Sequence, residues 1–270
     1  MSFNNACMQV LQRKLEAICP HGPGFDRITS RSIRPILLET FESLKAALRM
    51  CPLLQIVQWQ PHAGIDSREA LPNSVSALMG GCCLHLTHVS FVFCNLPNAA
   101  MSVLGQSKSL QALSLRHSHV MSFEIVLDRR DYTRQDHEKV WRGFPQLRCL
   151  DVSWSHGVYF CDLLQVAPQL LSLTLHGCDG VHGPLCKHLR NCVCLDICGT
   201  GIQDGDLSAL TEAAPHLKYL YISDRYANLW SDPLWTDGAM SEFRRRRPDV
   251  VVRTITSPHT PSEYERLGSK

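Results

Sequence analysis

The sequence lacks several features that would assign it to whole classes of protein. No apolar run approaches the roughly 18 residues that a membrane-spanning helix needs, and no basic segment followed by an apolar run marks a signal peptide. Asn-x-Ser/Thr glycosylation sites are missing, and a formal net charge of +2 is too small to indicate nucleic-acid or membrane binding by itself. We therefore expect a cytoplasmic or nuclear protein that does not contact membranes, with nucleic acid disfavoured as a partner.

The motifs of common catalytic and metal sites are missing as well. The chain has no Gly-x-Ser-x-Gly, Walker or Gly-x-Gly-x-x-Gly sequence and no Cys-x-x-Cys pair. Its 13 cysteines do not follow the spacing of a disulfide framework, so we expect reduced and mostly buried thiols. These absences predict no enzymatic activity, no cofactor and no metal site.

What the chain does contain is a pattern of apolar residues that recurs four times between residues 144 and 223. The copies start at Leu147, Leu170, Cys192 and Leu217, which lie 23, 22 and 25 residues apart. Each copy has apolar residues at its start, named position 0, and at positions +3 and +5. This pattern predicts a short strand entered by a turn, with +3 and +5 on one face of a sheet. At +8, three of the four copies carry a small residue that can bond to backbone where the chain turns away.

Looser copies precede these four, and a weaker one follows them. The earlier copies start at Leu54, Leu86 and Leu110, and the last starts near Pro248-Asp-Val250. Three gaps between copies are too long for a minimal repeat, so residues 60–82, 119–143 and 225–246 are predicted inserts. The aromatic residues of the third insert favour either packing over the end of the core or a binding edge.

The repeats resemble the cysteine-containing class of leucine-rich repeat that F-box substrate receptors carry. The best match is Thr200-Gly-Ile-Gln-Asp204, followed by Leu207, Leu210 and Ala-Pro-His-Leu217. The resemblance implies an α/β solenoid with a curved parallel sheet on its concave face and helices on its convex face. We expect this solenoid over residues 28–256, a helical cap over residues 1–27 and a disordered tail over residues 257–270.

Alternation along each strand places positions +2, +4 and +6 on the concave face. These positions are acidic near the centre, where Asp151 and Asp196 lie two strands, or about 9.6 Å, apart. A Lys or Arg of a partner is therefore predicted to bind between them, with Tyr219 and Tyr221 adding apolar contact. The alternative is an exposed sheet face without a partner. The predicted partner-binding residues are Arg116, Asp151, Ser153, Thr174, His176, Asp196, Tyr219 and Tyr221.

Three other kinds of site were weighed against this interpretation. Ser153, His176 and the two aspartates are residue types of a hydrolase, but an open sheet provides neither a pocket nor an oxyanion hole. Zinc is disfavoured because Cys194 and Cys198, four residues apart on extended chain, lie roughly 13 Å from each other. The cluster Arg244–Arg247 is typical of a solvated terminal helix, with a nuclear-localisation or nucleic-acid patch as the alternative.

The resemblance also implies a function. It predicts the substrate-recognition part of an SCF-type ubiquitin ligase receptor, which binds a protein substrate on its concave face. Residues 1–50 show no F-box motif, so contact with the F-box-binding adaptor would require an F-box elsewhere in a longer product. The alternative is a repeat-only scaffold or inhibitor that binds a protein partner without ubiquitin-ligase function. A third class is a nuclear factor that uses the arginine cluster.

Overall fold

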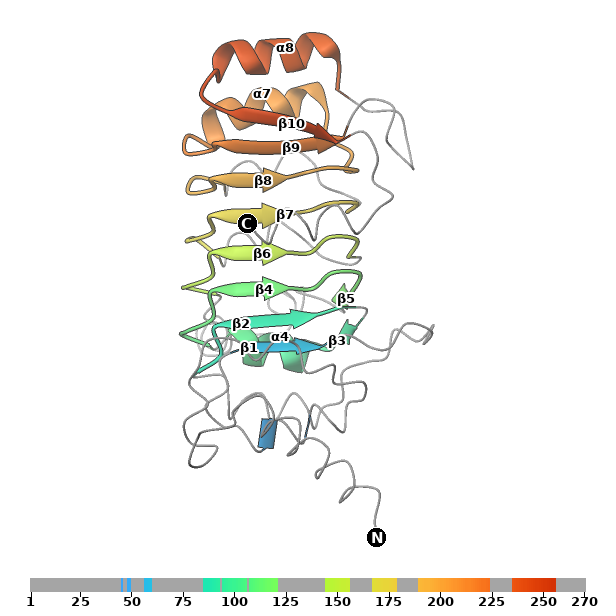
Figure 1. Cartoon of the computed structure of the whole chain (residues 1–270), viewed down its shortest axis with the longest axis vertical. Coiled ribbons are helices and arrows are strands. Elements are labelled where there is room, and N and C mark those ends of the chain that lie inside the picture. Colours follow the sequence, from blue (N-terminus) through green and yellow to red (C-terminus); the bar gives the residue numbers. More distant parts are fainter. Residues whose placement is uncertain are drawn as a thin grey trace, which may run out of the picture. The chain divides into compact units, whose positions relative to one another are not determined.

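The structure is a computed structural model in which the chain divides into two compact units, residues 1–146 and 147–270. Both units contain short parallel strands (Figure 1). No helix of the described residues is long and apolar enough to cross a membrane. The predicted cap, the predicted tail, the insert at 60–82 and residues 121–143 of the predicted insert at 119–143 lie outside the described residues, whereas residues 119–120 form strand β5. The described residues are 45, 48–49, 56–59, 85–92, 94–105, 107–120, 144–155, 167–178, 189–223 and 235–255.

The first unit contains three of the predicted strands. Strands β1, β2 and β4 pair in parallel, so that Ile56 lies opposite His88, and His88 opposite Ala112. Two shorter strands, β3 and β5, pair separately, and helix α4 lies between β3 and β4 in the sequence. The bounds are β1 (Ile56–Trp59), β2 (His88–Phe91), β3 (Asn95–Leu96), α4 (Asn98–Gly105), β4 (Ala112–Ser114) and β5 (His119–Val120).

The second unit continues the same pattern with five parallel strands. Cys149 lies opposite Ser172, Ser172 opposite Cys194 and Cys194 opposite Tyr219, and Tyr219 pairs in turn with Val251. The last strand confirms the weaker copy predicted near Val250. The bounds are β6 (Cys149–Asp151), β7 (Ser172–Thr174), β8 (Cys194–Asp196), α7 (Asp204–Ala213), β9 (Tyr219–Ser223), α8 (Asp237–Arg246) and β10 (Val251–Ile255).

The predicted register is confirmed by burial in both units. At positions 0, +3 and +5 of the six copies that start between Leu86 and Leu217, every side chain is 3% exposed or less. Full burial of one such side chain contributes about 1.5–3 kcal/mol. A single strand of three residues has no second layer to bury its apolar face, so each copy depends on its neighbours.

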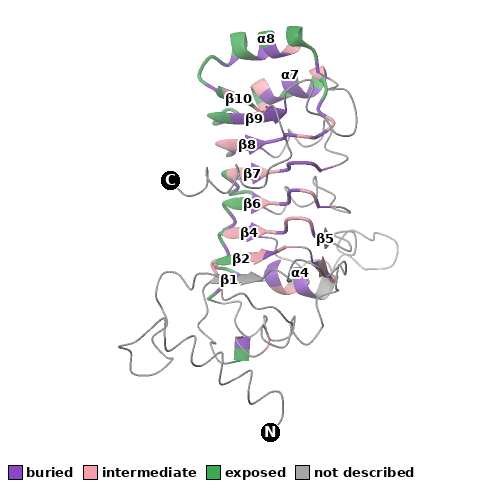
Figure 2. Ribbon diagram, turned by 45° about the vertical axis from the view of Figure 1, so that its right-hand side comes forward, coloured by how far each residue is buried: buried purple, intermediate pink, exposed green. Residues whose placement is uncertain are grey.

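Of the predicted insert at 225–246, the structure describes residues 235–246, and Asp237–Arg246 form helix α8. Trp235, Met240 and Phe243 are buried, which confirms packing on the core for this part of the insert. Helix α8 packs beside α7, and Figure 2 shows buried and exposed residues on both helices. The N-cap of α8 is tied to α7, because Asp204 accepts hydrogen bonds from the Thr236 amide at 2.6 Å and from its hydroxyl at 3.0 Å.

Strands β4, β6, β7 and β8 each end in a turn that places position +7 in the left-handed region. The φ angles there are 52° at His117, 58° at Trp154, 64° at Gly177 and 66° at Gly199. The small +8 residues that follow are buried, and the predicted bond from side chain to backbone is confirmed for Cys178 and Thr200. Thr200 Oγ1, for example, donates to the Ile197 carbonyl at 2.7 Å. The turn therefore closes each strand with satisfied polar groups.

The two glycine turns predict a measurable difference between matched variants. Gly199→Ala places a Cβ in the left-handed region but no nearer than 3.4 Å to Gly177 backbone, so only the backbone cost of about 1–2 kcal/mol applies. Gly177→Ala carries the same strain and also sets its Cβ 2.4 Å from Trp154 Cε3. We expect it to lower the free energy of unfolding by about 1 kcal/mol or more beyond Gly199→Ala, since overpacking costs about 1–3 kcal/mol. Urea denaturation of both variants measures the difference, and equal losses would contradict the packing of Trp154 on Gly177.

Candidate functional site

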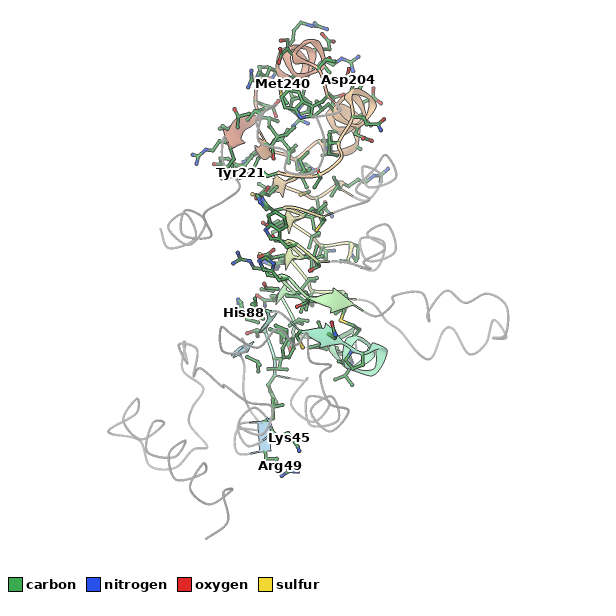
Figure 3. All side chains as sticks on the ribbon, turned by 90° about the vertical axis from the view of Figure 1, so that its right-hand side faces the viewer. Lys45, Arg49, His88, Asp204, Tyr221 and Met240 are labelled. Carbon is green, nitrogen blue, oxygen red and sulfur yellow. The ribbon has the colours of Figure 1, made fainter. Side chains whose placement is uncertain are left out.

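The second unit exposes one side of its sheet, which we name the strand face. Its residues at positions +2 and +4 all project from the same side of the strands. Tyr221 lies on this side, whereas Asp204 lies on the helix side (Figure 3). The exposed and half-buried residues of the strand face are Cys149, Asp151, Ser172, Thr174, Cys194, Tyr219, Tyr221, Val251 and Arg253. Asp196 occupies position +4 of β8 but is buried.

The largest exposed apolar groups of the strand face lie together on β9 and β10. Tyr219 is 42% exposed and Val251 is 48% exposed, and the two are directly opposite each other in the register. Next to them, Tyr221 pairs with Arg253, whose guanidinium carbon lies 5.9 Å from the centre of the tyrosine ring. This distance permits a cation–π contact, which holds the arginine over the ring. The result is an apolar patch with a cation at its edge.

The acidic part of the predicted site is less accessible than expected. Asp196, His176 and Ser153 are all buried, with at most 5% of their surface exposed. Asp196 Oδ1 accepts the Cys198 amide at 3.0 Å, and Asp151 Oδ1 accepts both the amide and the hydroxyl of Ser153. A partner cation would have to displace these internal bonds. The expectation that Ser153, His176 and Asp196 face solvent is therefore wrong.

Ser153 and His176, both at position +6, are buried because of the turn at +7, which alternation alone does not describe. At the end of β6, Trp154 adopts a positive φ, and its ring packs edge-to-face on His176 with 5.1 Å between ring centroids. Position +6 therefore lies beneath a turn rather than on an open strand. The other predicted residues divide between the units. Thr174 is half-buried on the strand face, whereas Arg116 is half-buried and belongs to the first unit.

The turns also bring together a group that the sequence analysis did not combine. His176, Asp196 and Cys198 are buried, and one ligand atom of each lies within 4.8 Å of the other two. His176 Nδ1 is 4.0 Å from Asp196 Oδ1. The available signal was position +6, which His176 and Cys198 occupy in consecutive copies. Distances between cysteines alone do not reveal that Cys198 lies beside a histidine of the preceding repeat.

The cysteines of the described part of the chain are free thiols. Burial raises the pKa of Cys192 to about 12, and it also raises the pKa values of Cys149 and Cys194. These three thiols therefore stay protonated at neutral pH. A protonated thiol is a poor nucleophile, which gives no support to a reactive cysteine at these positions.

The basic cluster is mostly committed to internal partners. Arg245 and Arg246 pair with Glu242 one turn earlier on α8, at 2.6 Å and 3.1 Å. The hydrogen bond from Arg245 lowers the pKa of Glu242. Arg247 is buried and bonds to backbone carbonyls of residues 214, 215 and 217. The predicted terminal helix is confirmed over Arg244–Arg246, but Arg247 is not a solvated residue.

The fold class is decided by parallel strands of three to five residues in consistent register. Four of them, β4, β6, β7 and β8, end in a left-handed turn followed by a buried +8 residue. The chain has a leucine-rich-repeat fold. This agrees with the fold that the sequence predicted for the described residues. Neither a protein-family model nor a curated protein matches the sequence.

Solved structures with similarity to this leucine-rich-repeat fold include three at low sequence identity. A chain of the TLR13–ssRNA13 complex has a TM-score of 0.43 at 16% identity, over 78% of this chain and 33% of that chain. A chain of the yeast Rad7–Elc1 complex has a TM-score of 0.42 at 14% identity, over 83% of this chain and 59% of that chain. A leucine-rich-repeat protein of Leptospira interrogans has a TM-score of 0.35 at 12% identity, over 77% of this chain and 56% of that chain. This chain thus spans between 33% and 59% of the length of these chains.

Proposed function

We propose that this chain is a protein-interaction module that binds a protein partner on the β9–β10 part of its strand face. The observation that carries the proposal is the direct pairing of Tyr219 with Val251, two of the most exposed large apolar side chains among the described residues. An isolated exposed apolar residue needs no explanation, but adjacent ones on a rigid sheet are typical of a contact surface. Tyrosine is also enriched among residues that carry binding energy.

The chemistry of this patch favours a particular kind of partner group. An apolar side chain can pack between the Tyr219 ring and Val251. Arg253, exposed on the next outward position of β10, can pair with a carboxylate beside that apolar group. The proposed partner segment therefore combines an apolar anchor with an acidic neighbour. This replaces the basic partner group predicted between Asp151 and Asp196, because Asp196 is buried.

Within this proposal, the repeats' resemblance to F-box substrate receptors favours the substrate-recognition part of an SCF-type ubiquitin ligase. The alternative remains a scaffold or inhibitor that binds its partner without ubiquitin chemistry. The two functions differ in the second protein that they recruit. A receptor in its full-length context co-purifies with the F-box-binding adaptor, and its partner accumulates when the proteasome is inhibited. A scaffold captures the same partner without either effect.

The binding surface is tested by replacing its two apolar groups together. Tyr219→Ala with Val251→Ser is expected to reduce capture of the partner at least about tenfold, because central aromatic contacts contribute about 2 kcal/mol or more. Both side chains are exposed, so the melting temperature should hardly change. The measurement is quantitative co-precipitation from cell extract, alongside a thermal melt.

Lys218→Ala is the matched control, because Lys218 is exposed directly before the same strand but does not belong to the strand face. Proteins that are lost with the double variant and kept with Lys218→Ala are the ones that bind the patch. If the double variant keeps its melt and retains every captured protein, the patch is not the binding surface. Asp196→Lys is unsuitable for this test, since a lysine at a buried position would destabilise the fold.

A further inference from the structure

Nitrogen, oxygen and sulfur ligands meet where β7 and β8 end. His176 follows β7 by two residues, Asp196 is the last residue of β8, and Cys198 lies two residues beyond Asp196. Their ligand atoms lie within 4.8 Å of one another, and all three residues are buried. The proposed partner surface uses none of the three. The proposed function therefore does not explain why these three side chains lie together.

The backbone holds these residues in place before any ligand is considered. The parallel pairing of Thr174 with Asp196 continues past the strands, because the Leu175 amide donates to the Asp196 carbonyl at 2.8 Å. The Gly177 amide then donates to the Cys198 carbonyl at 2.8 Å. This continuation sets His176 beside Cys198 in neighbouring copies. His176 and Cys198 are each followed by a glycine with positive φ, at residues 177 and 199. The two residues therefore occupy equivalent positions in equivalent turns of neighbouring repeats.

We propose that His176, Asp196 and Cys198 form a zinc-binding site. Imidazole, carboxylate and thiolate are the three protein ligands that Zn²⁺ takes, and a mixed set that includes a thiolate disfavours Mg²⁺ and Ca²⁺. The charges also match. One carboxylate and one thiolate carry two negative charges, which Zn²⁺ neutralises while the imidazole stays uncharged. Neutrality favours the bound state at a buried position, where separate charges would be costly.

The distances require only a small adjustment of side chains. Ligand atoms in a tetrahedral zinc site lie roughly 3.3–3.8 Å apart, given metal–ligand bonds of about 2.0–2.3 Å. His176 Nδ1 and Asp196 Oδ1 are 4.0 Å apart, and no pair among the three ligand atoms exceeds 4.8 Å. Rotation of the side chains about their own bonds can close these gaps without moving the strands. Three protein ligands leave the fourth tetrahedral position for a water molecule.

The backbone amide of Cys198 supports this arrangement as an outer contact. It donates to Asp196 Oδ1 at 3.0 Å, which fixes the direction of the carboxylate from within the site. Trp154 covers the other side, with its ring edge-to-face on His176. Contacts of this kind orient metal ligands and exclude bulk water. The ion would be held where the turns of two neighbouring repeats meet, by three protein ligands and with one position open to water.

The test is a titration of the full chain, reduced with a phosphine in place of a thiol, with Co²⁺ and then Zn²⁺ alone. Binding of one Co²⁺ at the site is expected to give a thiolate charge-transfer band in the near ultraviolet and ligand-field bands of tetrahedral intensity. Zn²⁺ should displace the Co²⁺ and abolish both kinds of band. It should also raise the melting temperature, because it binds only the folded state. X-ray absorption of the zinc form should show one sulfur ligand, with the remaining ligands nitrogen or oxygen. Absence of these bands, or two or more sulfur ligands, would overturn the proposal.

Variants assign the ligands. Cys198→Ser, His176→Gln and Asp196→Asn should each weaken cobalt binding at least about 100-fold, since loss of an outer contact alone costs 10–100-fold. The matched control is Cys194→Ser, a half-buried cysteine on the same segment, which should keep the bands and the affinity. If Cys198→Ser fails to fold, the histidine and aspartate variants make the same comparison. Retention of the charge-transfer band in Cys198→Ser, or its loss in Cys194→Ser, would place the thiolate ligand elsewhere and reject the site.

Discussion

Arg247→Ala is expected to lower the free energy of unfolding by about 3–5 kcal/mol, because it removes the donor of three backbone carbonyls and an unsatisfied buried group costs about 1–3 kcal/mol. The Arg247 side chain is only 10% exposed and lies at the C-cap of α8. Its guanidinium donates to the carbonyls of Ala214 and Leu217 at 2.9 Å and of Pro215 at 3.3 Å. These carbonyls belong to the segment that joins the end of α7 to β9, where helix carbonyls lack partners within the helix. Alanine would leave them buried without this donor.

Two controls separate this effect from the loss of a positive charge. Arg244→Ala removes a charge from an exposed position of α8 and should change stability by no more than about 0.5 kcal/mol. Arg247→Lys keeps the charge but loses the planar fork of donors, so it should recover little of the loss. The measurement is urea denaturation followed by circular dichroism. A midpoint for Arg247→Ala that matches Arg244→Ala would show that Arg247 does not hold the two helix ends together.

Leu173→Ala is expected to cost about 2–5 kcal/mol, which makes it the second large effect. Leu173 is 1% exposed in the middle of β7, which has β6 on one side and β8 on the other. Apolar +3 residues of both neighbouring strands, Leu150 and Leu195, lie opposite it in the register. A cavity at this position cannot collapse easily, because each of these neighbours is itself held in a strand.

The matched control for this variant is the same substitution two residues earlier. Leu171 is 39% exposed, so Leu171→Ala should cost well under half as much, on the order of 1 kcal/mol. Both variants are compared by urea denaturation of the full chain. Equal costs at the two positions would mean that Leu173 is not in the core, and the register of β7 would have to be revised.

The sequence alone was sufficient for the register of the repeats. Positions 0, +3 and +5 are fixed by the alternation of a strand and by the turn that enters it, both of which act over a few residues. Apolar side chains recurring at the same spacing then have to meet in one layer. This is why the buried residues of β2, β4 and β6–β9 follow from spacing, and why the small residues at +8 could be predicted to bond to backbone. The resemblance to leucine-rich repeats added the expectation that the sheet forms one face of the repeats and the helices form the other.

Exposure at the ends of the strands depended on tertiary structure. Alternation says on which side of the sheet His176 lies, but not that the turn at Trp154 covers it or that Cys198 of the next repeat lies beside it. The depth of a side chain depends on the conformation of the turn and on the neighbouring copy, and a spacing pattern contains neither.

Arg247 shows the same limit from the opposite direction. In the sequence it is one of four consecutive arginines, and a run of like charges normally predicts solvent exposure. In the folded chain, α8 ends beside the segment that follows α7, so a guanidinium reaches carbonyls that lie 30 to 33 residues earlier. Local preference determined that residues 237–246 form a helix. Only the packing of α8 against α7 decided which arginine is turned inward, because the hydrogen-bond acceptors that stabilise it belong to a distant part of the sequence.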